Sequence, residues 1–229
     1  MSWNFGILPK NRMNNRMNTD EFRKVDSIVN LIHEVIGQNP LDAKSEKNTE
    51  PVEVTITLAN TKLNDKQSEF WLDGLTERID EHVNQPTTAK EAKKTVDSSL
   101  SYIAKDKKKL MNMNFLLIED KNTTGLIGSY KDLESQPESE GLPNNWEGFF
   151  FKANESNKSR QLGTKGIGRF ALTTASKIQA FIAITKRETD NKYLMMGLSK
   201  MATPNRDDIG YFSKNEQNEP FELDSHEDA

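Results

Sequence analysis

The chain of 229 residues has no cysteine, only three histidines and no long apolar run. Without cysteine it can form no disulfide, no thiolate metal site and no cysteine nucleophile. The histidines stand far apart, at positions 33, 82 and 226, which argues against a zinc site. No segment approaches the roughly 18 uninterrupted apolar residues that a membrane-spanning helix needs, and this excludes a membrane protein.

An excess of basic residues is also missing. Thirty-one Lys and Arg against 35 Asp and Glu leave a net charge of −4, whereas nucleic-acid-binding domains are usually clearly basic. The first ten residues lack the apolar core of a signal peptide, so we expect a cytoplasmic protein. The hydrophobic fraction of 34% is low, but the length allows one large domain or two small ones with a buried core.

Apolar residues gather in four clusters, and the first two predict a helix and a strand. In the first, Phe22–Leu41, they recur at three- and four-residue steps, which is typical of an amphipathic helix that Pro40 disturbs or ends. The second, Val52–Leu58, alternates strictly and predicts a strand with one buried face. The following polar residues predict a two-part helical insertion over 62–110 with one stripe formed by Trp71, Leu75, Ile79 and His82.

The third and fourth clusters predict the rest of the core. Phe115–Ile118 is a short continuous apolar run, as in a central strand. A polar segment around Trp146–Phe151 has the length of a lid. The fourth cluster predicts a helix at Arg169–Lys177 and strands at Ile178–Ile184 and Tyr193–Leu198. Beyond Met201 the chain turns polar and ends in weakly patterned acidic residues, for which we expect a frayed tail or a domain boundary.

The most specific short motif is a glycine triplet, Gly163, Gly166 and Gly168, that leads into a helix. Glycines at this spacing let backbone N–H groups approach an anion, and the helix N-terminus adds a favourable potential. Lys165, inside the triplet, would add positive charge. A tight loop before a helix explains the same glycines without any ligand.

Two familiar phosphate-binding loops do not fit this triplet. A Walker loop requires Lys and then Ser or Thr after the last glycine, but Arg169 and Phe170 follow Gly168 here. A dinucleotide fingerprint has the opposite glycine spacing and an acidic residue about 20 positions further on, which is missing.

The second motif is an acidic end to the third apolar cluster. Glu119 and Asp120 follow Ile118, and Gly125 comes five residues after Asp120. A carboxylate at this position can accept a hydrogen bond from an exocyclic amine at the base of a pocket, while a glycine lets a flat ring lie against the backbone. An ordinary Asx-turn at the end of a strand is the alternative.

The third motif is the polar end of the first helix. Four polar or acidic residues stand there within nine positions: Glu34, Gln38, Asn39 and Asp42. Oxygen atoms of Asn and Glu on one polar face could hold a hydrated magnesium ion and orient a water molecule. An ordinary helix C-terminus with Asn39-Pro40 as its stop signal explains the same residues.

The order of these motifs resembles the GHKL ATPase superfamily, which comprises DNA gyrase, the Hsp-ninety chaperones, the histidine kinases and the MutL proteins. Asn39-Pro-Leu-Asp42-Ala43 is similar to the Asn-x-x-Asp-Ala signature of that superfamily and favours its gyrase and MutL side. The resemblance covers residues 20–200. It implies an α+β sandwich of the Bergerat type, with a mixed, mostly antiparallel sheet and helices on one face.

The resemblance also implies a role for each motif. Asn39 would bind Mg²⁺, Asp120 would read the adenine of ATP, and Gly125 would lie beside the base. Residues 127–162 would form a lid over ATP. The loop that passes under the phosphates would comprise Gly163, Lys165, Gly166, Ile167 and Gly168, and Asp42 would complete the nucleotide site.

One departure concerns the catalytic glutamate, which the family places four residues before the asparagine. That position is Val35 here, and Glu34 stands five residues before Asn39. On a regular helix Glu34 would lie about 140° away from Asn39. A one-residue π-bulge near Gly37 and Pro40 would restore the alignment, and we favour this arrangement with Glu34 as general base. Alternatively Gln38 takes the metal role; if neither holds, ATP is bound but poorly hydrolysed.

A second departure is the loop Asp120–Gly125, which lacks the family's first glycine and has one extra residue. The division expected along the chain is an N-terminal extension (1–18), an ATP-binding domain (19–205) and an acidic tail or the start of a missing domain (206–229).

The function implied by the resemblance is binding and slow hydrolysis of Mg-ATP, which drives lid closure, conformational change or homodimer formation. The chain would be the N-terminal module of a larger DNA-related or antiphage defence protein, with DNA or a protein as client. A nucleotide-binding regulatory module without turnover and a protein-interaction adaptor are the alternatives.

Overall fold

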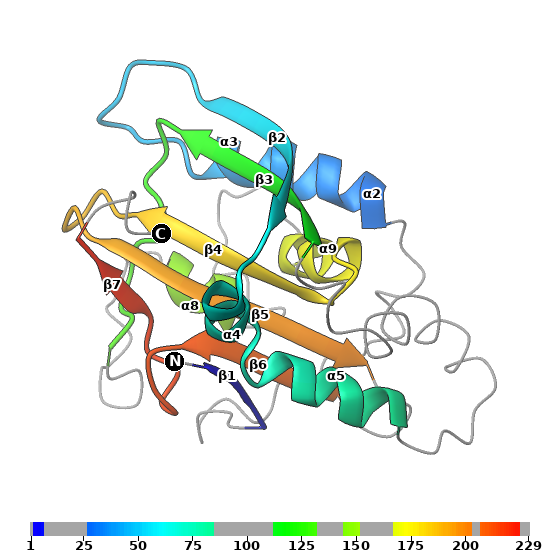
Figure 1. Ribbon diagram of the computed structural model, residues 1–229. Helices are drawn as coiled ribbons and strands as arrows, with labels where there is room; N and C mark the ends of the chain where they lie inside the picture. The colour runs from blue at the N-terminus through cyan, green and yellow to red at the C-terminus, as the bar shows by residue number, and fades with distance from the viewer. Residues whose placement is uncertain are drawn as a thin grey trace.

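Figure 1 shows the computed structural model of the protein, which describes residues 2–6, 27–84, 112–131, 144–151, 167–202 and 207–224. In chain order the elements are β1 (Ser2–Phe5), α2 (Ser27–Asn30), the π-helix η2 (Leu31–Gln38), α3 (Asn39–Asp42), β2 (Glu53–Lys62), α4 (Asp65–Leu72), α5 (Leu75–Asn84), β3 (Asn112–Lys121), α8 (Asn145–Phe150), α9 (Ile167–Ala175), β4 (Ala180–Lys186), β5 (Tyr193–Ala202), β6 (Asp207–Ser213) and β7 (Phe221–Leu223).

The centre of the molecule is a five-stranded sheet. Its strands follow the order β1-β6-β5-β4, and β7 pairs with the beginning of β5. Every pair in this sheet is antiparallel. The mixed α+β class and the antiparallel character expected from the sequence are therefore confirmed.

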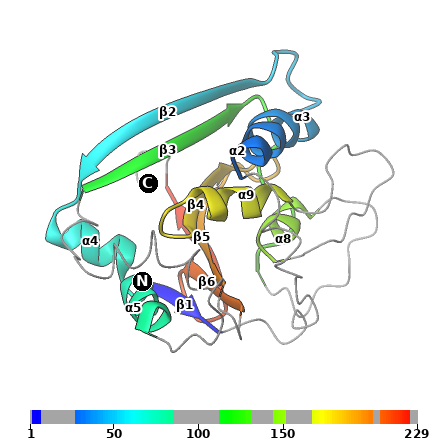
Figure 2. The same cartoon turned by 90° about the vertical axis from the view of Figure 1, so that its right-hand side faces the viewer.

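The sheet carries helices on both of its faces. Side chains of β5 alternate, so that Met195 faces one apolar cluster while Leu194 and Met196 face another. Leu75 and Ile79 of the α4–α5 unit fill the first cluster. The second cluster contains three aromatic side chains from α8 and the residue after it: Trp146, Phe150 and Phe151. The prediction of helices on one face only is wrong, because the sequence contains two separate helical stripes and each covers its own face (Figure 2).

Residues 2–5, expected in an N-terminal extension, form the edge strand β1 beside β6. Trp3 is 5% exposed and holds β1 against the α4–α5 unit. Its backbone N–H donates to the carbonyl oxygen of Asp73 and its indole N–H to that of Trp71, both at 2.8 Å. These residues are therefore part of the central sheet, held by their pairing with β6 and by the buried Trp3.

Helical structure is confirmed in the first part of the insertion expected over 62–110, but it is divided into α4 and α5 at Asp73–Gly74, a break that the single stripe from Trp71 to His82 did not predict. Asn64 and Gln67 form a capping box at the start of α4. Gly74, with a φ of +80°, separates the two helices. The rest of the expected helical insertion, residues 85–110, lies outside the described residues.

The region assigned to an acidic tail contains strands of the central sheet. β6 lies between β1 and β5, and its Tyr211 and Phe212 are 2% and 0% exposed. β7 adds Phe221 to the first apolar cluster. Residues 207–224 therefore belong to the core, because a few apolar residues in register with β5 outweigh the polar surroundings from which the tail was inferred.

Part of the segment expected to form the lid is also core. Trp146 and Phe150 of α8 are 0% and 1% exposed, and the hydroxyl of Tyr211 donates to the carbonyl oxygen of Phe150 at 3.2 Å. Such burial is incompatible with a freely moving lid, so the prediction is corrected for residues 144–151. Residues 132–143 and 152–162 lie outside the described residues.

The first helix is described from Ser27 onward and differs from a regular α-helix. Hydrogen bonding over Leu31–Gln38 is of the π type, so the structure has an eight-residue π-helix where the sequence predicted a one-residue π-bulge near Gly37 and Pro40. Leu31 and Glu34 are buried, whereas Val29 and Ile32 are 59% and 57% exposed, so the apolar face inferred from a regular 3.6-residue period is wrong at these two positions.

Strands β2 and β3 form a separate antiparallel pair, in which Ile56 lies opposite Ile118 and Leu58 opposite Leu116. Both strands were predicted from the sequence. We expected β3 at the centre of the sheet, but Leu116 is 45% exposed, and this expectation is wrong in the described structure. The pair, called the β2–β3 ribbon below, lies above the central sheet in Figures 1 and 2.

Candidate functional site

Three chain segments meet at one place, which we call the motif junction: residues 43–45 after α3, residues 122–126 after β3, and residues 185–188 at the end of β4. The N–H of Thr124 donates to the carbonyl oxygen of Ala43 at 2.8 Å, and that of Ser45 to the carbonyl oxygen of Asn122 at 3.1 Å. The N–H of Glu188 donates to the carbonyl oxygen of Thr124 at 3.0 Å. The helix-end motif and the strand-end motif are therefore joined through their backbones.

Gly125 lies at the closest point of this junction. Its φ of +66° is in the left-handed region, which glycine adopts most easily. A Cβ atom there would overlap the carbonyl oxygen of Lys186 and stand 2.7 Å from Oγ1 of Thr185. The neighbouring N–H of Leu126 donates to the same Thr185 Oγ1 at 2.9 Å. Only a glycine fits this close contact between the loop after β3 and the backbone of β4.

A polar cluster closes one side of the junction. The hydroxyl of Ser45, which is 3% exposed, donates a hydrogen bond to the carboxylate of Glu188. Nζ of Lys47 lies 3.4 Å from the other oxygen of that carboxylate. The hydrogen bond from Ser45 and, secondarily, the charge of Lys47 lower the pKa of Glu188. The carboxylate therefore stays ionised and fixes the β4–β5 turn to the segment that follows α3.

Glu34 lies in the middle of the π-wound segment η2, and Asn39 is the first residue of α3, directly after it. Because π-type hydrogen bonds join residues five apart, the spacing from Glu34 to Asn39 corresponds to about one turn of such a helix. Glu34 is 6% exposed, and its Oε1 lies 3.3 Å from Nδ1 of the exposed His33. Asn39 is exposed and Gln38 is half-buried. Glu34 is thus buried and Asn39 exposed, and the alignment of their side chains toward one ligand stays a prediction.

The other carboxylates of the predicted site are less enclosed. Asp120 lies on the β2–β3 ribbon opposite Val54, and its side chain is exposed. Asp42, the last residue of α3, is half-buried. The described structure thus brings the loop after Asp120 into the junction but leaves Asp120 itself on the open ribbon.

The predicted phosphate loop is described only at its end. Gly163, Lys165 and Gly166 lie outside the described residues. Ile167 and Gly168 are the first two residues of α9, so the helix expected after the glycines is confirmed and begins two residues earlier than predicted. α9 packs against α2 and η2. The helix that follows the glycine motif is therefore a direct neighbour of the helix that carries Glu34.

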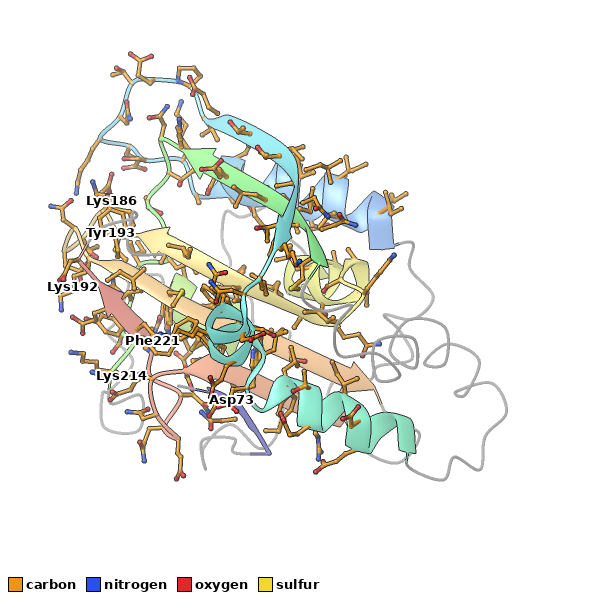
Figure 3. The ribbon with its side chains drawn as sticks, viewed as in Figure 1. Asp73, Lys186, Lys192, Tyr193, Lys214 and Phe221 are labelled. Carbon is orange, nitrogen blue, oxygen red and sulfur yellow. The ribbon has the colours of Figure 1, made fainter. Side chains whose placement is uncertain are left out.

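The strand β4 was predicted from the sequence, but the place of its last residues and of the following turn at the motif junction was not. Thr185 is 8% exposed at the end of an otherwise apolar strand, and that single hydroxyl was the available signal. Figure 3 shows Lys186, Lys192 and Tyr193 at the β4–β5 turn. The ammonium group of Lys186 lies 5.4 Å from the centroid of the Tyr193 ring.

Lys192 belongs to an ionic cluster that anchors the start of the expected lid. Its Nζ donates to the hydroxyl of Tyr130 and to Glu222, both at 2.9 Å, and Nζ of Lys131 lies 2.7 Å from Glu222. Hydrogen bonds from Lys131 and Lys192 lower the pKa of Glu222 to about 2. The hydroxyl of Tyr130 and the carboxylate of Glu222 raise the pKa of Lys192. Arg187 lies over the Tyr130 ring, with its guanidinium carbon 4.8 Å from the centroid.

Among the described residues, no three His, Asp or Glu side chains gather as a metal site. Within the same residues, no helix has the length and apolar character needed to cross a membrane.

Comparison of the chain with protein-family models, with curated proteins and with solved structures finds no match.

Proposed function

We propose that this protein binds Mg-ATP in a site of the Bergerat type and hydrolyses it slowly. The observation that carries this proposal is the motif junction, in which hydrogen bonds join Ala43 and Ser45 to the loop after Asp120. The packing of α9 against η2 supports it further, since both helices border the same region. Two of the three motifs are thus joined through their backbones, and the helix that follows the third motif packs against η2.

In this proposal Glu34 activates the water molecule that attacks the γ-phosphorus atom. The water gives a proton to the Glu34 carboxylate, a new P–O bond forms, and the bond from the γ-phosphorus to the ADP oxygen breaks in line with it. Backbone N–H groups near Gly168, at the start of α9, are suited to the developing phosphate charge. Asp120 would accept a hydrogen bond from the adenine amine, with Gly125 beside the ring.

The residues near the helix end offer too few ligands to hold a metal by themselves, but they suit a magnesium ion that is also bound by phosphate and water. Asn39 offers an amide oxygen at an exposed helix end, and Gln38 offers a second one nearby. Magnesium in nucleotide sites typically takes one or two protein oxygens and completes its shell with phosphate and water. When bound, the ion would neutralise charge on the phosphates.

The first test is calorimetric titration with Mg-ATP. Asp120→Asn replaces the acceptor for the adenine amine by an amide, and we expect ATP affinity to fall about 10- to 100-fold, as for loss of a hydrogen bond to a charged group. Glu69→Gln, on α4 and away from the junction, is the matched control and should bind as the wild type does. Absence of binding heat in the wild-type protein would overturn the proposal and favour the adaptor.

The second test separates hydrolysis from binding. Glu34→Gln should retain ATP binding and lose the slow release of phosphate, because the amide cannot accept the proton of the attacking water. Glu69→Gln again serves as control. A wild-type protein that binds ATP and releases no phosphate would favour the regulatory module without turnover.

The proposed wider role of the protein rests on the family that its motifs resemble. Hydrolysis would act as a timer for a conformational change and for homodimer formation, within a larger DNA-related or defence protein in the cytoplasm. Ultracentrifugation with a non-hydrolysable ATP analogue tests the dimer directly: the proposal expects a doubling of mass on nucleotide binding.

A further inference from the structure

The outer edge of β2 lacks the features that normally keep a strand from pairing with another molecule. Among the described strands β2 pairs only with β3, so the backbone N–H and C=O groups on its other side have no strand partner there. Charged residues, proline and bulges commonly protect such an edge. The eight residues Val54–Thr61 contain neither a charge nor a proline, and they pair with β3 one to one, without a bulge. This edge is therefore suited to accept a further strand.

The edge also faces away from the rest of the molecule. In Figure 2 β2 lies on the far side of β3 from the central sheet. Leu58, in the middle of β2, is 82% exposed, and Ile56 is 51% exposed. A second molecule can therefore approach the outer edge of β2 without displacing any other described strand.

The sequence of β2 suits pairing with a copy of itself. Thr57 is the centre of a nearly symmetric pattern, in which Ile56 and Leu58 are followed outward by Thr55 and Ala59. Two copies related by a two-fold axis perpendicular to the sheet run antiparallel, and residues equally far from the axis lie opposite each other. With the axis at Thr57, each Ile56 lies opposite Leu58 of the second copy. The centre of the contact is then formed by two matched apolar pairs.

The charges of β2 also fit this register, because they stand only at the two ends of the strand. Glu53 lies opposite Thr61 of the second copy, so that no like charges face each other across the contact. An axis at Leu58 would place Ile56 opposite Asn60 and lose both apolar pairs. The pattern therefore favours Thr57 as the centre.

We propose that two copies of the chain pair through the outer edges of β2, with Thr57 on the two-fold axis, and join their ribbons into one four-stranded antiparallel sheet. The apolar stripe of each ribbon then continues into that of the other copy; it consists of Ile56, Leu58, Leu116 and Ile118. Each copy contributes the same edge, so the pairing closes after two chains. This contact requires no nucleotide and is separate from the nucleotide-dependent dimer proposed above.

Self-complementarity favours a second copy over a strand of another protein as the occupant of this edge. A foreign strand would need no symmetry about Thr57, whereas pairing with a copy requires that each residue suit its symmetric counterpart. Only one strand of each copy takes part, and stable complexes bury roughly 1,200–2,000 Å². We therefore expect a weak dimer, which a covalent cross-link can trap.

Cysteine cross-linking tests both the dimer and its register, since the chain contains no native cysteine. Thr57→Cys would meet its own copy at the axis, where the Cα atoms of opposite residues are about 4.5–5.5 Å apart. A disulfide spans this distance. Under mild oxidation without nucleotide we expect a disulfide-linked dimer.

Thr55→Cys and Ala59→Cys are the matched controls, because both positions are exposed on the same face of β2 as Thr57. In the proposed register each would lie about 13 Å from its own copy, so neither should cross-link alone. The two lie opposite each other, so an equal mixture of these variants should give a linked dimer. Absence of a dimer with Thr57→Cys, or equal yields from all three single variants, would overturn the proposal.

Charge variants test the contact without a covalent bond. Thr57→Lys places two like charges at the axis and should abolish the dimer that sedimentation velocity detects at high protein concentration. Thr61→Lys adds the same charge on the same face but lies opposite Glu53, so it should dimerise at least as well as the wild type. Equal dimerisation of the two variants would overturn the register. A wild type that stays monomeric at its highest soluble concentration would overturn the dimer.

Hydrogen exchange gives a measurement on the unmodified protein, which does not depend on whether the variants fold. Alternate N–H groups of β2 point away from β3. Their exchange should slow as the protein concentration rises, by about tenfold when about nine-tenths of the chains are dimeric, because exchange then proceeds from the remaining monomer. Slow exchange that does not depend on concentration would show that another part of the same chain covers the edge, and would overturn the proposal.

These experiments contain no nucleotide, so their failure would leave the calorimetric test of the ATP site unaffected. Thr57→Lys also separates the two proposed dimers. This variant should remain monomeric alone and still double its mass with the non-hydrolysable ATP analogue. A variant that dimerises equally well without the analogue would show that the edge of β2 is not the contact.

Discussion

The backbone N–H of Thr124 donates a hydrogen bond to the carbonyl oxygen of Ala43 at 2.8 Å. This single bond joins the end of the first helix to the loop after β3, which lies about 80 residues further along the chain. A second bond, from Ser45 to Asn122, keeps the two segments in register. The junction is therefore a fixed structural feature, on which the position of both sequence motifs depends.

Gly125→Ala should destabilise the protein by at least about 2 kcal/mol. The substitution places a side chain at a φ of +66° and pushes its Cβ against the backbone of Lys186. Urea unfolding of the two proteins measures the difference. Gly148→Ala in α8 is the control, because a Cβ there meets nothing within 4 Å. Equal stability of Gly125→Ala and the wild type would contradict the close contact at the junction.

Thr185→Val should cost about 1–3 kcal/mol of folding free energy. Valine has nearly the same shape but leaves the partly buried N–H of Leu126 without its acceptor. Thr185→Ser keeps the hydroxyl and should retain most of the stability, so the pair of variants isolates the hydrogen bond. Chemical denaturation is the measurement; a serine variant that is less stable than the valine variant would show that the methyl group matters more.

Phe150→Ala should destabilise the protein by about 3–5 kcal/mol, the usual loss for truncating a buried phenylalanine. Phe150 is 1% exposed between α8 and the central sheet. Phe150→Leu keeps most of the volume and should cost clearly less. Thermal unfolding followed by circular dichroism gives both values. A negligible effect of the alanine variant would mean that α8 leaves the core easily, as expected of a lid.

Glu222→Gln should make the protein less stable at pH 7, by up to about 1 kcal/mol, because the lost ion pairs are partly exposed. Lys131 and Lys192 hold the pKa of Glu222 at about 2 in the folded protein, below the ordinary value of 4.5. The carboxylate therefore stabilises the fold above pH 4.5, and this stabilisation is lost as the pH falls toward 2.

Urea unfolding at several pH values tests this dependence. The difference between the wild type and Glu222→Gln should shrink as the pH falls from 4.5 to 2. Glu216→Gln, on the exposed turn between β6 and β7, is the control and should show no such trend. A difference that stays constant over this range would contradict the ionic cluster.

Local patterns allowed a substantial part of the fold to be predicted. β2 and β3 follow from the alternation after Val52 and from the apolar run at Phe115, while α9 follows from the glycine motif at its start. β6 was missed because its apolar residues are few, and β1 because a four-residue strand carries too little pattern. Their places in the sheet depend on contacts with distant residues, such as those of Trp3 with the α4–α5 unit.

The candidate site divides in the same way. The sequence by itself determined the types and order of its residues, including the five-residue spacing from Glu34 to Asn39 and the glycine at position 125. Only the tertiary structure decided that π-type winding brings this spacing close to one turn, and that Thr185 forms the wall against which Gly125 lies. The physical reason is that chemical type and local conformation are encoded residue by residue, whereas the meeting of segments 80 residues apart depends on the packing of the whole chain.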